Sequence, residues 1–196
     1  MANKVAVRGG TLVSIVGFVT AGLLLSHTPQ EESGRKVDVK IATDGAATVR
    51  HISGKQYLRA YLDIVGVATA CDGLTSYRGR KIRITDQFTE QQCAVMLEEA
   101  LIDHANGVMQ CTPGLALTYA GRDRARFAAV SLAYNVGVPN YCDSTARRLF
   151  NAGQIGPACN AILSWNKITK NGKKVVSNGL AARRERERAI CAKDAS

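Results

Sequence analysis

The chain has 196 residues, and 46% of them are hydrophobic, which is enough for the core of one domain and excludes an intrinsically disordered chain. The formal net charge of +10 favours polyanionic partners. Aromatic residues make up only 6% and do not interleave with the basic clusters, so a base-stacking platform is excluded and no nucleic-acid partner is expected.

The N-terminal segment is apolar and flanked by charge. Lys4 and Arg8 precede a stretch without charged residues from Gly9 to Gln30, and Glu31–Glu32 follow it. A bilayer-spanning helix needs roughly 20 residues, and basic residues before it orient the N-terminus inward. Several glycine, serine and threonine residues make the segment only weakly apolar, so it could leave the membrane. We predict that residues 1–28 form a signal-anchor; a cleaved signal peptide, for which no clear A-x-A site exists, and a buried core helix are the alternatives.

Residues 29–45 are polar and mixed in charge, and we predict a linker there, followed by a folded domain over residues 46–196. Residues 46–60 have a helical pattern. Residues 61–85 combine short apolar runs, β-branched residues and glycines, which predicts a small antiparallel sheet.

The rest of the chain has helical signals. Thr89 and Gln92 form the capping-box pattern Thr-x-x-Gln, which predicts a helix running to about residue 106. Further helices are expected near residues 123–135, 143–151, 156–166 and 179–192. The fold class is therefore α+β, a mostly helical domain with one small antiparallel sheet, preceded by an N-terminal apolar helix.

The cysteines are even in number and widely spaced, and no CxxC pair occurs; they are Cys71, Cys93, Cys111, Cys142, Cys159 and Cys191. This usage is typical of three disulfides in an oxidising compartment, and the spacing alone leaves the pairing open. A zinc knuckle or a thioredoxin-like site is not predicted, and we expect no metal or other cofactor.

The stretch from Tyr61 to Thr75 carries the chemistry. Asp63 and Thr69 lie on either side of a turn at Gly66. A carboxylate and a hydroxyl that face one cleft can hold and activate a water molecule. Taken alone, an aspartate beside a turn is more often part of the turn itself.

This stretch resembles the phage-type lysozymes of glycoside hydrolase family 24, and within them the signal-anchor-release endolysins. The matching motif residues are Tyr61, Asp63, Gly66, Thr69, Gly73 and Thr75. Four later segments match in order, and they are Phe88–Cys93, Ala133–Gly137, Ala152–Trp165 and Gly179–Cys191. Together these matches cover about residues 46–191.

The resemblance implies a lysozyme that cleaves the β-1,4 bond between N-acetylmuramic acid and N-acetylglucosamine in peptidoglycan during host lysis. It assigns Asp63 to positioning or activating water and Thr69 to supporting that water. It also implies the disulfides Cys71–Cys93 and Cys159–Cys191, and then Cys111–Cys142 is left. The implied location is the host inner membrane facing the periplasm, held through residues 9–28, followed by release to the periplasm; a monomer is expected.

The family also carries a catalytic glutamate nine residues before this aspartate, and here that position is Gly54. This general acid protonates the leaving sugar oxygen. His51, one helical turn earlier, is our candidate substitute acid, and Asp72, Asp86 and Glu90 are further candidates. Alternatively the domain is inactive and binds peptidoglycan or another partner. An insertion that shifts the alignment is disfavoured, because no glutamate is near at any offset.

The basic residues form two clusters. Residues 167–188 contain eight basic and two acidic side chains, and residues 78–83 contain four basic ones. In an exported protein the expected polyanion is the cell wall or the outer leaflet of the outer membrane. Solvated helix faces with Arg–Glu pairs are the alternative for residues 183–188.

Overall fold

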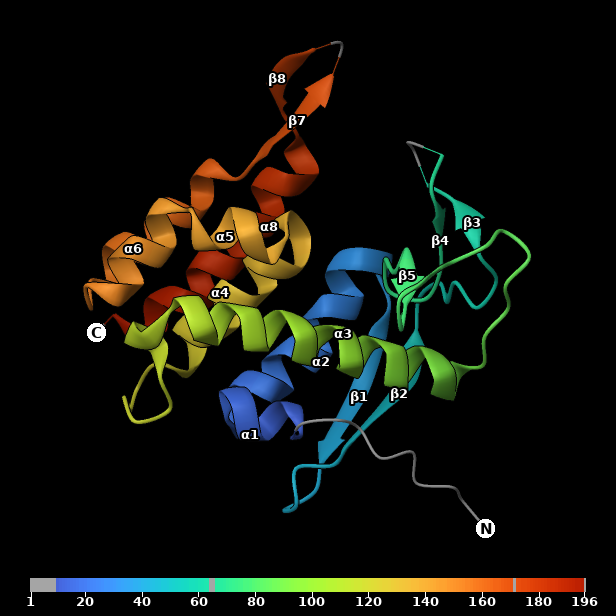
Figure 1. Cartoon of the computed structure of the whole chain (residues 1–196), viewed down its shortest axis with the longest axis horizontal. Helices are drawn as coiled ribbons and strands as arrows, with labels where there is room; N and C mark the ends of the chain where they lie inside the picture. Colours follow the sequence, from blue (N-terminus) through green and yellow to red (C-terminus); the bar gives the residue numbers. More distant parts are fainter. Residues whose placement is uncertain (1–9, 64–65, 171, 196) are drawn as a thin grey trace. The chain divides into compact units, whose positions relative to one another are not determined.

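The computed structural model describes residues 10–63, 66–170 and 172–195, and these form two compact units (Figure 1). The first unit contains residues 22–102 with the described residues up to Ser14, and the second contains residues 15–21 and 103–195.

The apolar N-terminal segment forms two helices, α1 (Leu12–Val16) and α2 (Phe18–Ser33), separated by Gly17. Many of its apolar side chains are buried, namely those of Leu12, Val16, Ala21, Leu24 and Leu25. Among the described residues, no helix is both long enough and apolar enough to cross a membrane.

Residues 36–53 form an antiparallel hairpin of β1 (Lys36–Ile41) and β2 (Ala47–Ser53), with Val39 opposite Val49. The turn is closed by the side chain of Asp44, which accepts a hydrogen bond from the backbone of Ala46. The helix predicted for residues 46–60 is therefore wrong, because the β-branched residues of β2 pair with those of β1.

Three further strand pairs exist in the described part of the chain, so the prediction of one small sheet is wrong, while its antiparallel character is confirmed. The pairs are β3 (Tyr61–Leu62) with β4 (Ala68–Thr69), β5 (Ser76–Tyr77) with β6 (Arg80–Lys81), and β7 (Lys167–Lys170) with β8 (Lys173–Val176). Except for β7 and β8, these strands are only two residues long.

The core of the first unit lies where the turn after β4 meets α3 (Glu90–Cys111). Ala70, Ile82 and Met96 are buried there, together with the disulfide between Cys71 and Cys93. The predicted capping box at the start of α3 is confirmed, since Thr89 and Gln92 exchange backbone-to-side-chain hydrogen bonds of 2.7 and 3.1 Å.

The second unit is helical apart from β7 and β8, and the four helices predicted from its sequence are confirmed as α4 (Asp123–Val136), α6 (Thr145–Asn151), α7 (Ile155–Ala161) and α8 (Asn178–Cys191). The unit also has helix α5 (Val138–Cys142), which was not predicted, and the short 3-10 helices η1 (Pro113–Leu115), η2 (Ile162–Ser164) and η3 (Ala192–Asp194). α4 is buried over most of its length and packs against α8. All three implied disulfides are present: Cys71–Cys93, Cys111–Cys142 and Cys159–Cys191.

Candidate active site

The pairing of β3 with β4 brings Asp63 and Thr69 together, because Tyr61 lies opposite Thr69 in the register. Both side chains bind the backbone of Val67. An Asp63 carboxylate oxygen accepts a hydrogen bond from the Val67 amide at 2.8 Å, and the Thr69 hydroxyl donates to the Val67 carbonyl at 3.1 Å. Asp63 and Thr69 are therefore linked through the backbone of one residue, Val67, in the first unit.

A second carboxylate, that of Glu32, lies against the same motif. Glu32 is in the last turn of α2, and its Oε2 atom is 2.9 Å from the place where a Cβ on Gly73 would be. Gly73 also has a left-handed φ of +80°. Only glycine combines that backbone with so close an approach, so Gly73 makes room for the Glu32 carboxylate.

Tyr61 interacts with both acids. Burial raises the pKa of its phenol, and the charges of Tyr57, Asp63 and Glu32 raise it further. The Tyr57 ring packs against the Tyr61 ring at a centroid distance of 4.4 Å. Tyr61 is thus within electrostatic range of both the Asp63 and the Glu32 carboxylates.

The hairpin β1–β2 explains why the sequence did not reveal Glu32. It separates Glu32 from Asp63 along the chain, yet its two ends meet: a Cβ on Gly54 would be 2.7 Å from the Arg35 Cα and 2.8 Å from the Gly34 carbonyl oxygen. A glutamate carboxylate therefore lies near the motif in the fold, although none lies near it in sequence. Alternation of Val37, Val39 and Ile41 before an Asp-Gly turn was the available signal for such an insertion.

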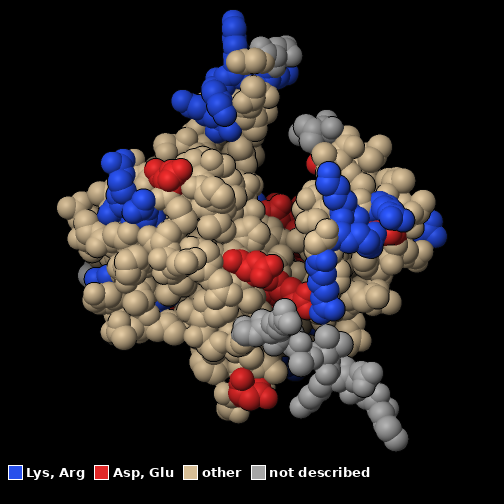
Figure 2. All heavy atoms as spheres, in the orientation of Figure 1, with Lys and Arg blue, Asp and Glu red and all other residues tan. Residues whose placement is uncertain are grey.

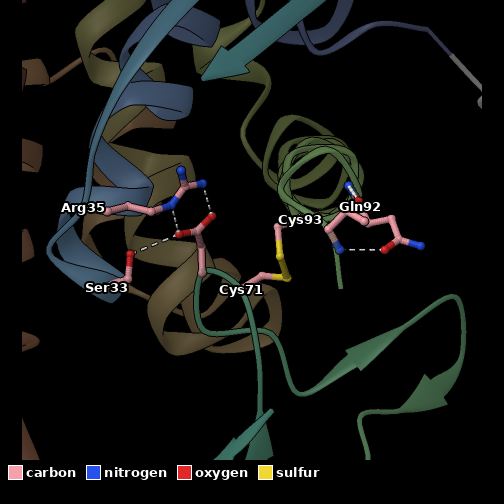
Figure 3. The surroundings of a disulfide bond; sticks show 7 residues. Ser33, Arg35, Cys71, Gln92 and Cys93 are labelled. Atoms are coloured by element: carbon pink, nitrogen blue, oxygen red, sulfur yellow. Dashed lines mark hydrogen bonds and ion pairs between the residues drawn. A yellow bond between two sulfur atoms is a disulfide. The ribbon is translucent and has the colours of Figure 1, made fainter. Parts of the chain in front are cut away.

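The carboxylates of Asp72, Asp86 and Glu90 have hydrogen-bond partners, whereas the buried Nδ1 atom of His51 has none within the described part of the chain. His51 lies in β2, and its backbone amide donates to the Glu90 carboxylate at 2.6 Å, so both of these residues join the hairpin to α3. Asp86 accepts hydrogen bonds from the Arg83 amide and the Arg80 guanidinium, and mainly the former lowers the pKa of its carboxyl. Asp72 is buried and paired with Arg35 (Figure 3).

The basic run of residues 167–188 divides into two parts with different roles. Lys167, Lys170, Lys173 and Lys174 are exposed on the β7–β8 hairpin, where basic side chains gather (Figure 2). The Arg183 and Arg184 side chains are instead buried and pair with the buried Glu187 carboxylate. The solvated face considered for residues 183–188 is thus wrong for these two arginines, which contribute no basic surface.

No cluster of three or more His, Cys, Asp or Glu side chains suitable for a metal ion occurs within the described ranges. The chemistry available at the motif is that of two carboxylates, a hydroxyl and a phenol.

Comparison with known proteins shows the family of the chain. Residues 53–187 match the phage lysozyme family. The SAR-endolysin of Pseudomonas phage phiKMV is 34% identical over 78% of this chain and 92% of its own length. The chain belongs to the phage lysozyme family. It is therefore an endolysin-type glycoside hydrolase of the lysozyme class, with peptidoglycan as its substrate.

Further relatives support this membership. The SAR-endolysin of Enterobacteria phage P21 is 36% identical over 71% of this chain and 77% of its own. Among solved structures, the endolysin of Escherichia coli O157:H7 phage FAHEc1 has a TM-score of 0.62 at 30% identity, covering 69% of this chain and 83% of its own. The active form of P1 phage endolysin Lyz has the same TM-score at 20% identity and covers 96% of this chain and 98% of its own, which is evidence for the fold alone.

Proposed function

We propose that this lysozyme cleaves the β-1,4 bond between N-acetylmuramic acid and N-acetylglucosamine with Glu32 as the general acid, Asp63 as the second carboxylate and Thr69 supporting the water. The observation that carries this proposal is the approach of the Glu32 carboxylate to Gly73, within the motif that contains Asp63 and Thr69.

Glycoside hydrolysis requires a proton donor for the leaving oxygen and a second carboxylate for the sugar or the water. Glu32 and Asp63 supply this pair, and both charges act on Tyr61. Position 54 requires glycine for a steric reason, because the backbone of Arg35 leaves no room for a side chain there. The substitute acid proposed from the sequence, His51, is then unnecessary.

The experiment uses the full chain, purified with its disulfides intact, and measures clearing of purified peptidoglycan together with mass spectrometry of the products. Glu32→Gln and Asp63→Asn should each reduce the rate by about 10²–10⁴. Glu31→Gln is the matched control, because it removes a charge one position earlier on α2. Both this control and His51→Ala should retain most of the activity.

Two outcomes would contradict the assignment. Full activity of Glu32→Gln would exclude it as the acid, and loss of activity confined to His51→Ala would identify the imidazole instead. Binding of the wild type to peptidoglycan without any clearing would mean that the domain binds rather than cuts.

We also propose that residues 9–28 tether the chain to the inner membrane before its release to the periplasm, where it acts as a monomer. The charges at Lys4 and Arg8 and the name SAR-endolysin of the relatives support this. In the folded chain the same segment is packed inside, with Leu24 and Leu25 buried and the Thr20 hydroxyl bonded to the Asp123 carbonyl. Truncation of residues 1–28 would thus remove core residues as well as the tether.

Substitutions that make the segment more apolar are a better test. Gly22→Ala fits the folded chain, since its Cβ would be 3.9 Å from Ile41 Cδ1, and Ser26→Ala removes only local hydrogen bonds. In fractionated host cells the double variant should remain longer in the membrane pellet than the wild type. Wild-type protein found only in the cytoplasm with reduced cysteines would contradict the tether.

A further inference from the structure

The buried carboxylate of Asp72 is held by two residues from the end of α2 and the turn after it. The Arg35 guanidinium donates to both carboxylate oxygens, with Nε and Nη2 each at 2.7 Å, and the Ser33 hydroxyl donates at 3.1 Å (Figure 3). Such a bidentate pair fixes orientation as well as distance. It thereby sets how the end of α2 lies on the turn at Asp72.

Both neighbours of Asp72 are also engaged. Cys71 forms the disulfide to Cys93 in α3, and Gly73 lies against the Glu32 carboxylate. Three successive residues therefore contact α3, the end of α2 and the proposed acid. Glu32 is next to Ser33 in the chain, so a movement of the Arg35–Asp72 pair would move the acid.

The energetics indicate that this pair has a role besides stability. A buried ion pair loses solvation of both charges, and apolar residues of similar size often stabilise a fold as well or better. What an apolar pair cannot provide is the directional geometry of a guanidinium fork on a carboxylate.

We propose that Arg35 and Asp72 are positioning residues, which act through Ser33 and the turn to hold the Glu32 carboxyl where it can protonate the leaving oxygen. This inference rests on the proposed role of Glu32. A displaced acid would still allow the glycan to bind. Loss of the Arg35–Asp72 pair should therefore lower kcat and leave KM nearly unchanged.

The test compares Asp72→Asn with Glu187→Gln in the full, oxidised chain, using a soluble peptidoglycan oligosaccharide. Glu187 is a matched control, because it is also a buried carboxylate held by arginines and a serine, here Arg183, Arg184 and Ser131. Asp72→Asn should lower kcat at least tenfold with KM within about twofold. Glu187→Gln should lower the melting temperature but leave kcat near the wild-type value.

Two milder variants keep the question answerable if Asp72→Asn does not fold. Arg35→Lys retains the charge but loses the fork, and Ser33→Ala removes the hydroxyl that bonds Asp72 and the Pro29 carbonyl of its own helix. We expect kcat to fall several-fold in Arg35→Lys, and less in Ser33→Ala.

The proposal is overturned if folded Asp72→Asn, or both milder variants, have the wild-type kcat. It is also overturned if these variants lose no more kcat than Glu187→Gln does at the same drop in melting temperature. Glu32→Gln is measured alongside. If Glu32→Gln is inactive, a wild-type kcat in the Asp72, Arg35 and Ser33 variants refutes the positioning role alone. If it is fully active, the assignment of the acid fails and the positioning role fails with it.

Discussion

Gly54 lies directly against the backbone of Arg35, so that a Cβ on Gly54 would be only 2.7 Å from the Arg35 Cα. The two residues are separated in sequence by the whole β1–β2 hairpin, and their contact closes it at its base. The chain therefore enters and leaves the hairpin at almost the same place. This relationship supports the proposal that Glu32 is the acid and that the hairpin is an insertion after it.

Replacing residues 36–53 with a single glycine is therefore expected to preserve catalysis. The deletion removes His51 but keeps Glu32, Arg35 and Asp63. We expect peptidoglycan clearing within about tenfold of the wild type. The melting temperature should fall, because Val49 is buried. A deletion variant that is folded by circular dichroism and inactive would show that the hairpin supplies an essential group.

Gly73→Ala should reduce activity far more than stability. The new Cβ would be 2.9 Å from the Glu32 carboxylate and would displace it. A misplacement of about 1 Å can cost on the order of 10²-fold in rate. Gly79→Ala is the matched control, because Gly79 has a similar φ of +77° but a Cβ added there would meet no other atom within 4 Å.

Both glycine variants should lose about 1 kcal/mol or more of stability to the left-handed backbone, as measured by urea unfolding. Only Gly73→Ala should lose activity on peptidoglycan. Equal rates in the two variants would argue against the close approach of Glu32.

The disulfides should differ in what they contribute. Replacing either Cys71 and Cys93 or Cys159 and Cys191 by alanine opens a loop and should cost about 3 kcal/mol of stability. The first pair adjoins Asp72 and Gly73, so its removal should also lower kcat at 25 °C. The second pair should affect thermal unfolding alone; equal kcat losses in both double variants would contradict this difference.

Glu98 and Glu99 in α3 should respond to pH with opposite signs. Burial, followed by the charge of Glu99, raises the pKa of the Glu98 carboxyl. The folded state then binds this proton more tightly than the unfolded state, so stability falls as pH rises through that range. Glu98→Gln should raise the free energy of unfolding at neutral pH and give no gain at acidic pH, where the carboxyl is protonated in both the folded and the unfolded state.

Glu99→Gln is the comparison. The hydrogen bond from Arg78, at 2.6 Å, lowers the pKa of the Glu99 carboxyl, so its contribution is present above the ordinary carboxyl pKa and lost as pH falls. Glu99→Gln should therefore lower the melting temperature at neutral pH. Destabilisation by Glu98→Gln at neutral pH would contradict the assigned cause.

Local signals predicted much of the second unit. The helices near Asp123 and Asn178 have strong periodicity, and the capping box at Thr89 defines the start of α3 through two local hydrogen bonds. The motif around Asp63 and Thr69 also followed from sequence, because a short strand pair brings the two together. These features depend on residues that are close in the chain.

The features that sequence reasoning missed depend on contacts between distant residues. Nothing in the local pattern at Glu32 indicates that its carboxylate lies over Gly73, since the hairpin intervenes. Asp72 likewise has the sequence context of a turn residue, and its partner Arg35 is 37 positions away. For the same reason Arg184 looked like surface charge, although its side chain is fully buried beside Glu187.

The order of the disulfides has a consequence for assembly. Cys71 pairs with Cys93, Cys111 with Cys142 and Cys159 with Cys191, so the cysteines pair consecutively along the chain, first with second, third with fourth and fifth with sixth. A chain that enters an oxidising compartment from its N-terminus presents each native pair before the next pair arrives. Oxidation in order of emergence then yields the native connectivity directly, with no need for slow reshuffling by an isomerase.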